Sequence, residues 1–518
     1  MKNEKVTFKE YQMDQPMLLP PSIEELIPEK HLVRVINQVV EKMEIEAIIR
    51  EYKGGGTSSY HPKMLLKLVV YAYAVQIYSG RQIAKAIREN IPFMWLSGGN
   101  RPDFRTINRF RSEKLKGRIQ AVFTEVLQYL IEAKYIRLEH YFVDGTKIEA
   151  NANKYSFAWK KSTQKYKKNL QEKVTELFQQ IDEINKTEEA EYGDDDLEEL
   201  GEKSEIDTEK LKELAERLSK KLEQEPGNKA NKKALKQLKK DFIPRMEKYE
   251  RYEKVLGKRN SFSKTDQDAT FMRMKDDPMR NRSLKPGYNI QIGTEDQFIV
   301  GFSVHQTSTD SPTLIEHMRQ VKQNLGVLPP TWIADAGYGS EENYLEFEKE
   351  QIEAYVKYNS FHQESKKKRK HAEKEKYLAR NFQYDEMQNV FICPQNKHLI
   401  FEKNTRYKTD AGFETKRSVY RCHDCLDCPA RELCTQSKYG RTIQFSPRLA
   451  RLRKQAYDRL NSEVGKKLRT RRYPEVEAVF GLLKGNKKFR RFNLRGLEKV
   501  AVEWGLLSIA HNISKIAA

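Results

Sequence analysis

Residues 141–147 read Tyr-Phe-Val-Asp-Gly-Thr-Lys, and residues 332–339 read Trp-Ile-Ala-Asp-Ala-Gly-Tyr-Gly. In each stretch an apolar run ends at an aspartate, Asp144 or Asp335, which predicts a carboxylate at the end of a buried strand. A third acid, Glu477, lies in a stretch with helical apolar spacing. Two strand-terminal aspartates and a helical glutamate suit a pair of hard divalent cations, which stabilise the attacking and leaving oxygens of phosphoryl transfer. Each aspartate taken alone has a simpler explanation, because aspartates commonly cap turns.

The sequence around these acids predicts the rest of a sheet. Residues 288–293 and 298–305 alternate as strands around a turn at Thr294–Gln297. A helix over 341–350 and a strand over 353–358 follow the second aspartate. This order of strands, helix and strand predicts an α/β domain with a central mixed sheet.

The overall charge favours a polyanionic partner. The chain of 518 residues has 95 Lys and Arg against 74 Asp and Glu, which gives a net charge of +21. Such a surplus attracts phosphates without regard to sequence. No apolar run approaches the roughly 18 residues of a membrane span, and the N-terminus lacks the apolar core of a signal peptide. We therefore expect a cytoplasmic, nucleoid-associated protein with no membrane contact.

Residues 1–134 predict a helical N-terminal domain. Apolar spacing and start signals predict helices over 32–43, from Pro62, over 79–90 and from Pro102. The last of these helices carries three arginines, namely Arg105, Arg109 and Arg111. Short helices with a basic face are typical of a DNA-binding helix-turn-helix, but an ordinary bundle with a solvated basic face has the same pattern.

Two insertions interrupt the predicted core. Residues 161–258 are rich in Lys, Glu and Gln and carry heptad-like leucine stripes, which predict two or three long helices packed as an intramolecular hairpin or as a dimerisation arm. Residues 359–440 begin with the basic run Lys366–Lys370 and hold all five cysteines. Paired Cys-x2-Cys steps are typical of structural Zn²⁺ sites. We expect Cys393, Cys425, Cys428 and Cys434 as ligands with Cys422 in reserve; the alternative is free buried thiols.

The C-terminal part predicts helices that begin at Pro447 and Pro474. With Pro474 at the first helical position, Glu477 falls in the first turn and Val476, Val479, Phe480 and Leu483 form a buried stripe. Glu475 is the rival third carboxylate, which we interpret as an acid that complements the helix dipole. Basic residues on both sides of Glu477 are expected to bind DNA, namely Arg472, Lys484, Lys487, Lys488, Arg490 and Arg491.

Three of these stretches resemble the catalytic segments of bacterial insertion-sequence transposases of the DDE class. They are YFVDGTKIEANANKYSFAWKK at 141–161, ADAGYGSEENY at 334–344 and RRYPEVEAVFGLLKGNKKFRRF at 471–492. The stretches IPEKHLVRVINQVV at 27–40 and FRTINRFR at 104–111 resemble parts of the helical domain that precedes this core in many such enzymes. Related enzymes have Tyr and Arg in a different order and spacing before the glutamate, which leaves the role of Arg472 open.

The resemblance implies an RNase H-like catalytic core assembled from residues 135–160, 259–358 and 441–518. It implies that Asp144, Asp335 and Glu477 hold two Mg²⁺ ions, with Mn²⁺ as a substitute, and that Lys484 and Arg472 contact DNA. The expected reactions are cleavage at the terminal inverted repeats and joining of the freed ends to target DNA. The expected partners are element ends, target DNA and further copies of the chain, as a homodimer or a higher oligomer.

Two other functions share these residues. A nuclease of the same core would cut without joining, because the metal chemistry is common to both. A catalytically silent DNA-binding protein derived from a transposase is disfavoured, since all three carboxylates are present.

Overall fold

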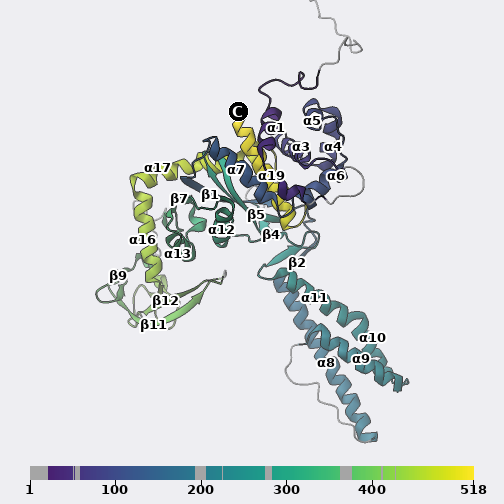
Figure 1. Ribbon diagram of the computed structural model, residues 1–518. Helices are drawn as coiled ribbons and strands as arrows, with labels where there is room; N and C mark the ends of the chain where they lie inside the picture. The colour runs from purple at the N-terminus through teal and green to yellow at the C-terminus, as the bar shows by residue number, and fades with distance from the viewer. Residues whose placement is uncertain are drawn as a thin grey trace, which may run out of the picture. The chain divides into compact units, whose positions relative to one another are not determined.

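The computed structural model describes residues 22–50, 52, 59–192, 206–224, 226–274, 283–361, 376–409, 412–425 and 427–518 (Figure 1). The basic run Lys366–Lys370 lies outside these residues. The chain divides into two compact units, Met1–Tyr135 with Val502–Ala518, and Ile136–Ala501. No helix among the described residues is long and apolar enough to span a bilayer.

The first unit is helical, as predicted. Pro62 occupies the first turn of its helix, and Asp103 caps another by accepting the Thr106 N–H at 2.8 Å. Both are start signals that satisfy or avoid an orphan N–H group. The helices are α1 (Leu32–Lys42), α2 (Glu46–Ile49), α3 (Pro62–Ala74), α4 (Gly80–Glu89), α5 (Ile91–Leu96), α6 (Phe104–Arg109) and α7 (Ile119–Glu132), joined by the last residues of α19 (Leu497–Ile516).

The second unit contains the predicted mixed sheet. Its strands are β1 (His140–Glu149), β4 (Thr270–Arg273), β5 (Leu284–Glu295), β6 (Phe298–His305), β7 (Thr331–Ala334) and β8 (Glu353–Val356). The order is β4-β5-β1-β7-β8, with β6 also paired to β5. Strand β1 is antiparallel to β5 and parallel to β7, and β7 is parallel to β8. The α/β class is thereby confirmed.

Two glycines let an aromatic side chain pack flat on this sheet. Gly293 and Gly301 face each other on β5 and β6, and a Cβ at either position would overlap the ring or hydroxyl of Tyr141. The Tyr141 hydroxyl lies 2.7 Å from Nε2 of His317 on α12 (Leu314–Leu325). Burial lowers the pKa of His317 to about 3, so the imidazole is neutral at pH 7. Helix α12 is thus fixed against the sheet.

The strand that carries Asp144 is longer than predicted. Asp144 lies in the middle of β1 and pairs with Ile292, because the residues that follow it continue the ladder with β5 as far as Glu149. The prediction that Asp144 ends a strand was wrong. Asp335 does follow the last residue of β7, as predicted.

The first insertion is a helical bundle that enters and leaves through the paired strands β2 (Phe157–Trp159) and β3 (Ser261–Ser263). Its helices are α8 (Lys160–Tyr192), α9 (Thr208–Gln224), α10 (Lys229–Gln237) and α11 (Ile243–Leu256), with α8 and α11 side by side (Figure 1). Leu170 and Val174 of the predicted stripe share one buried cluster with Leu211, Leu214 and Leu218. The stripes therefore pack within the chain, as the hairpin alternative requires.

The second insertion is an antiparallel sheet, a structure that the cysteine spacing did not predict. Its strands lie in the order β13-β12-β11-β10-β9. They are β9 (Gln383–Asp385), β10 (Val390–Ile392), β11 (His398–Lys408), β12 (Glu414–Arg421) and β13 (Thr442–Phe445). The buried side chains of Phe391, Leu399 and Tyr420 belong to its small core.

Of the two prolines predicted to start C-terminal helices, only one does so. Pro447 does start α16 (Pro447–Asn461). Pro474 starts no helix, because α17 (Glu463–Arg472) is already formed and leads into a π-helical turn at Tyr473–Glu477. Such a turn tolerates the missing proline N–H inside a helical stretch. The chain continues through α18 (Ala478–Gly481), a second π-helical turn (Leu482–Asn486) and α19.

Candidate active site

Two of the three predicted carboxylates lie at equivalent positions of neighbouring parallel strands. Phe142 of β1 is the register partner of Ile333 of β7. Asp144 and Asp335 each follow two residues later, so the alternation of side chains directs both to the same face of the sheet. The register therefore places two acids that are far apart in the sequence on one face of the sheet. Among the described residues, however, no three Asp, Glu, His or Cys side chains are gathered closely enough to hold a metal ion, and this includes the candidate carboxylates.

Glu477 joins Asp144 through a shared arginine. Nη2 of Arg472 lies 3.2 Å from Oδ2 of Asp144, and Nη1 donates to Oε1 of Glu477 at 2.9 Å. The Arg472 side chain is only 9% exposed, whereas that of Glu477 is 43% exposed. The low exposure of the Arg472 side chain makes its charge costly to leave unpaired, and the two carboxylates supply its partners. Arg472, predicted to contact DNA, thus lies at the centre of the acidic site.

The loop after β7 fixes the carboxylate of Asp335. Oδ1 of Asp335 accepts the Gly337 N–H at 2.8 Å and so caps a short 3₁₀ turn. The Tyr338 hydroxyl donates to Oε1 of Gln291 on β5. Burial, and then the charges of Asp144, Asp310 and Asp335, hold the pKa of Tyr338 well above its usual value, so the phenol stays a hydrogen-bond donor.

A fourth carboxylate, Asp310, lies beside these groups. Its Oδ1 accepts from Nδ2 of Asn289 at 2.8 Å and from Nε2 of Gln291 at 3.2 Å. A Cβ at Gly145 would approach the same oxygen at 2.6 Å, which explains the glycine directly after Asp144. Asp310 has no apolar run directly before it, so the pattern that marks Asp144 and Asp335 does not mark it. Its one signal is its place shortly after β6.

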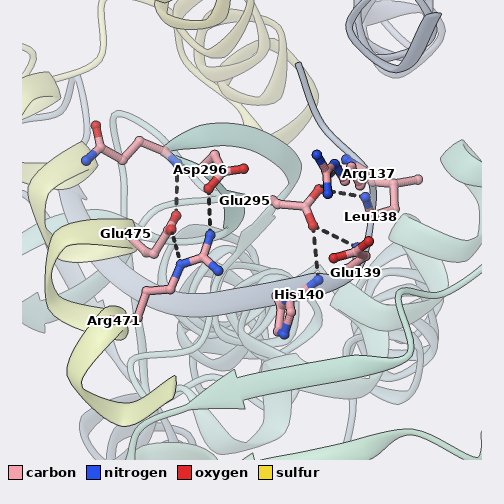
Figure 2. A network of polar contacts seen from close by, with 9 residues as sticks. Arg137, Leu138, Glu139, His140, Glu295, Asp296, Arg471 and Glu475 are labelled. Atoms are coloured by element: carbon pink, nitrogen blue, oxygen red, sulfur yellow. Dashed lines mark hydrogen bonds and ion pairs between the residues drawn. The ribbon is translucent and has the colours of Figure 1, made fainter. Parts of the chain in front are cut away.

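The predicted rival for the third carboxylate has a different role. Oε2 of Glu475 accepts the Gln297 N–H at 2.9 Å, and Oε1 accepts from Nε of Arg471 at 2.8 Å (Figure 2). Arg471 also pairs with Asp296. The prediction that Glu475 complements a helix N-terminus was wrong, since the helical stretch begins at Glu463. Glu475 instead ties the C-terminal helical stretch to the turn between β5 and β6.

The same turn also fixes the start of β1. Glu295 is 3% exposed, and its two oxygens accept four successive backbone N–H groups (Figure 2). These groups are those of Arg137 at 2.8 Å, Leu138 at 2.6 Å, Glu139 at 2.7 Å and His140 at 3.0 Å. The turn at 295–297 therefore contacts both the strand that carries Asp144 and the helical stretch that carries Glu477.

The predicted DNA-binding cations of the C-terminal part differ in exposure. Lys488, Arg490 and Arg491 are exposed, and Lys484 is half-buried. Lys487 is buried, and desolvation lowers its pKa. The intervening Phe489 and Phe492 pack on each other with ring centroids 5.5 Å apart. Alternation of core phenylalanines with outward cations thus accounts for this run, and Lys487 is the member least available to a phosphate.

The three N-terminal arginines also separate. Arg105 and Arg109 are exposed one turn apart on α6. Arg111 is 2% exposed and donates to the Tyr73 hydroxyl at 3.1 Å, the Tyr78 carbonyl at 2.7 Å and Oδ1 of Asn108 at 2.7 Å. Because its guanidinium is enclosed by its own domain, Arg111 holds the helices together and does not form part of a basic surface.

All five cysteines line one small cavity next to Phe382 and Leu399. Burial and a hydrogen bond with Cys425 raise the pKa of Cys422 to about 12. In the part of the chain that the structure describes, no three or more His, Cys, Asp or Glu side chains are gathered as a metal site. The cavity brings the predicted thiols together, but as placed they do not form a zinc centre.

Two segments match family models. Residues 392–517 match the model described as "Transposase DDE domain", and residues 21–113 match "Transposase domain (DUF772)". Glu477 and Arg472 lie inside the first segment, whereas Asp144 and Asp335 lie outside both. No curated protein and no solved structure gave a match.

Proposed function

We propose that this chain, whose two matched segments indicate an insertion-sequence transposase, binds the terminal inverted repeats of its element, cleaves them and joins them to target DNA. A DDE domain implies an enzyme that cuts and joins phosphodiesters with divalent metal ions. The observation that carries the proposal is the convergence of Asp144 and Glu477 on Arg472, with Asp335 at the equivalent position of the neighbouring strand.

The sheet order supports an RNase H-like core. Three antiparallel strands, β6, β5 and β1, continue into the parallel strands β7 and β8. Asp144 lies on the central strand β1, and Asp335 follows the parallel strand β7. Glu477 lies on a helical stretch that packs against the sheet. Ligands of α/β sheets commonly bind at the carboxyl ends of parallel strands, which is where Asp335 lies.

The donor set fits Mg²⁺ better than a softer metal. Asp144, Asp335 and Glu477 offer carboxylate oxygens and no thiolate or imidazole, and Mg²⁺ prefers a few such oxygens with water and phosphate. When bound, the ions would activate the attacking oxygen and stabilise the leaving one. Arg472 would hold the carboxylates of Asp144 and Glu477 in place before DNA arrives. Lys484, seven residues after Glu477, would orient a phosphate.

The direct test uses duplexes that carry the sequences flanking the gene. Purified protein with Mg²⁺ should nick the labelled ends and then join them to a second duplex. Nicked ends without joined products would favour the nuclease alternative. Absence of both, with binding retained, would favour the catalytically silent one.

We expect Arg105 and Arg109 to recognise the element ends. Each phosphate contact that is lost should lower the slope of log affinity against log salt by about 0.9. Replacing both arginines with alanine should therefore reduce the slope by about two and weaken end binding more than binding to unrelated duplex. A fluorescence titration at several salt concentrations would measure this.

The control is Arg319→Ala with Lys322→Ala, two exposed cations of α12. If the arginine variant loses affinity equally for element ends and for unrelated duplex, the helical domain is only a nonspecific basic surface.

Arg111→Ala should behave differently and lower the thermal midpoint of unfolding, because it leaves buried acceptors unpaired at a cost of about 1–3 kcal/mol each.

We also propose a structural Zn²⁺ for the second insertion. Its support is the shared cavity and the thiolate chemistry of Cys393, Cys425, Cys428 and Cys434. Reduced, chelator-free protein should contain about one Zn²⁺ per chain by elemental analysis, and Cys425→Ser or Cys428→Ser should release it. Cys422→Ser is the control and should retain it. Protein without zinc would leave the cysteines as free thiols.

A further inference from the structure

The β11–β12 hairpin extends beyond its own sheet as a two-stranded ribbon. Strand β10 pairs with β11 only at His398–Ile400, and β13 pairs with β12 only at Ser418–Arg421. From Thr405 and Arg417 outward, the two strands pair only with each other among the described residues. A ribbon of this kind is narrow enough to follow a DNA groove or backbone.

One face of the ribbon is tied to the first residue of helix α13 (Glu341–Lys349). The Thr415 hydroxyl donates to Oε1 of Glu341 at 2.9 Å, and Nε of Arg448 donates to the same oxygen at 2.7 Å. Glu341 is buried and opens α13, in the segment that follows Asp335. The ribbon is therefore positioned by the same segment that carries the second candidate carboxylate.

The other face carries two cations directly opposite each other. Arg406 is the register partner of Lys416, and both are exposed. Like charges at opposed positions of an antiparallel pair are destabilising. Neither residue forms an ion pair with a described acid. Glu414, two residues before Lys416 on the same strand, pairs with Lys408 at 3.0 Å. The folded ribbon thus keeps a repulsive pair that an anion would neutralise.

These cations line an open cavity. They share it with Glu414 and Thr415 of β12 and with Ser446, Pro447 and Arg448 at the start of α16. The Glu414 carboxylate is already paired with Lys408 at 3.0 Å. The Ser446 hydroxyl caps that helix by accepting the Leu449 N–H at 3.3 Å. The positive end of the helix dipole adds to the two side-chain charges. An anion with several acceptor oxygens suits this lining, and a phosphodiester is such a group.

We propose that Arg406 and Lys416 bind a backbone phosphate of duplex DNA and hold the duplex along the ribbon. The inference rests on the proposed function and names a DNA contact outside the acidic site. A duplex is favoured over a small phosphate compound because the cavity is open, lies on an extended ribbon, and belongs to a chain of net charge +21.

The test compares two double variants of the full chain on a short duplex of arbitrary sequence. Arg406→Ala with Lys416→Ala should lower the salt slope by about one to two units. Lys403→Ala with Lys438→Ala removes the same charge from exposed positions of the same insertion that do not line the cavity, and should change the slope less. Arg406→Lys with Lys416→Arg keeps both charges and should retain binding.

Three measurements separate the outcomes: thermal unfolding, the salt slope of duplex binding, and binding of inorganic phosphate. Thermal unfolding without DNA should show the alanine variant at least as stable as the wild type, because a repulsive pair has been removed. Equal slopes for the two alanine variants, or loss of inorganic phosphate binding with an unchanged DNA slope, would overturn the site. If the wild-type protein binds no duplex at all, the proposed function is overturned together with this inference. If the wild type cleaves DNA and the Arg406→Ala with Lys416→Ala variant keeps the wild-type salt slope, this inference alone is overturned.

Discussion

Cleavage of element ends is expected to fall about a thousandfold or more in Asp144→Asn, Asp335→Asn and Glu477→Gln, while end binding stays nearly unchanged. The carboxylates would hold metal ions whose charge stabilisation is worth several kcal/mol, and each 1.36 kcal/mol is a factor of ten in rate. Each substitution removes a charge and keeps the side-chain shape. Single-turnover nicking of a labelled end, together with a binding titration, would measure both effects.

Glu475→Gln is the matched control for this series. Glu475 and Glu477 are two residues apart, yet Glu475 is 5% exposed and bonded to Gln297 and Arg471. Its amide variant should lose stability and keep most of the cleavage rate of the folded enzyme. Retained cleavage in Glu477→Gln with loss in Glu475→Gln would move the third ligand to the rival position.

Patterns of apolar residues predicted the elements of the core well, because burial on a sheet or helix face follows simple periods. Strands β5 to β8, helix α13 and the starts at Pro62 and Pro447 all lie close to their predicted places. The buried stripe of Val476, Val479, Phe480 and Leu483 is confirmed. The apolar periodicity therefore predicted the buried face correctly, although the helix start predicted at Pro474 was wrong.

Local rules failed where distant contacts decide. Pro474 has the sequence signature of a helix start, but the preceding turns already pack against the sheet and a π-helical turn absorbs the proline. Arg109 and Arg111 look alike in sequence, yet Arg111 is enclosed because its guanidinium donates to acceptors that include the hydroxyl of Tyr73 and the carbonyl of Tyr78. Asp310 reaches the candidate site through Asn289 and Gln291, which no local pattern announces.

The turn at 295–297 explains how the two halves of the candidate site keep their alignment. Asp296 and Gln297 both have positive φ, 48° and 62°, as a tight hairpin between β5 and β6 requires. The turn lies next to the start of β1 through Glu295 and next to the C-terminal helical stretch through Gln297. Asp144 and Glu477 are therefore positioned against one common element.

Glu295→Gln is expected to be the most destabilising single substitution in this turn, at about 2–4 kcal/mol, because hydrogen bonds to a charged acceptor are worth about 1.5–3 kcal/mol each. The carboxylate accepts four N–H groups, whereas an amide has one acceptor oxygen and turns its own N–H₂ towards the remaining donors. One of those donors belongs to Leu138, whose φ of 60° is itself unfavourable for a branched side chain. The loop before β1 should therefore open when the carboxylate is neutralised.

Asp296→Asn is the control, since it removes one charge from the next residue of the same turn. Its side chain is 61% exposed and pairs with a partly exposed arginine, so about 0–1 kcal/mol is expected. Urea unfolding followed by tryptophan fluorescence would compare the two variants, because Trp332 is fully buried next to Tyr141 on the sheet that the turn supports. Hydrogen exchange at Arg137–His140 should accelerate in Glu295→Gln alone. Equal midpoints for both variants would mean that the four N–H groups find water or other acceptors, and that β1 does not depend on this carboxylate for its position.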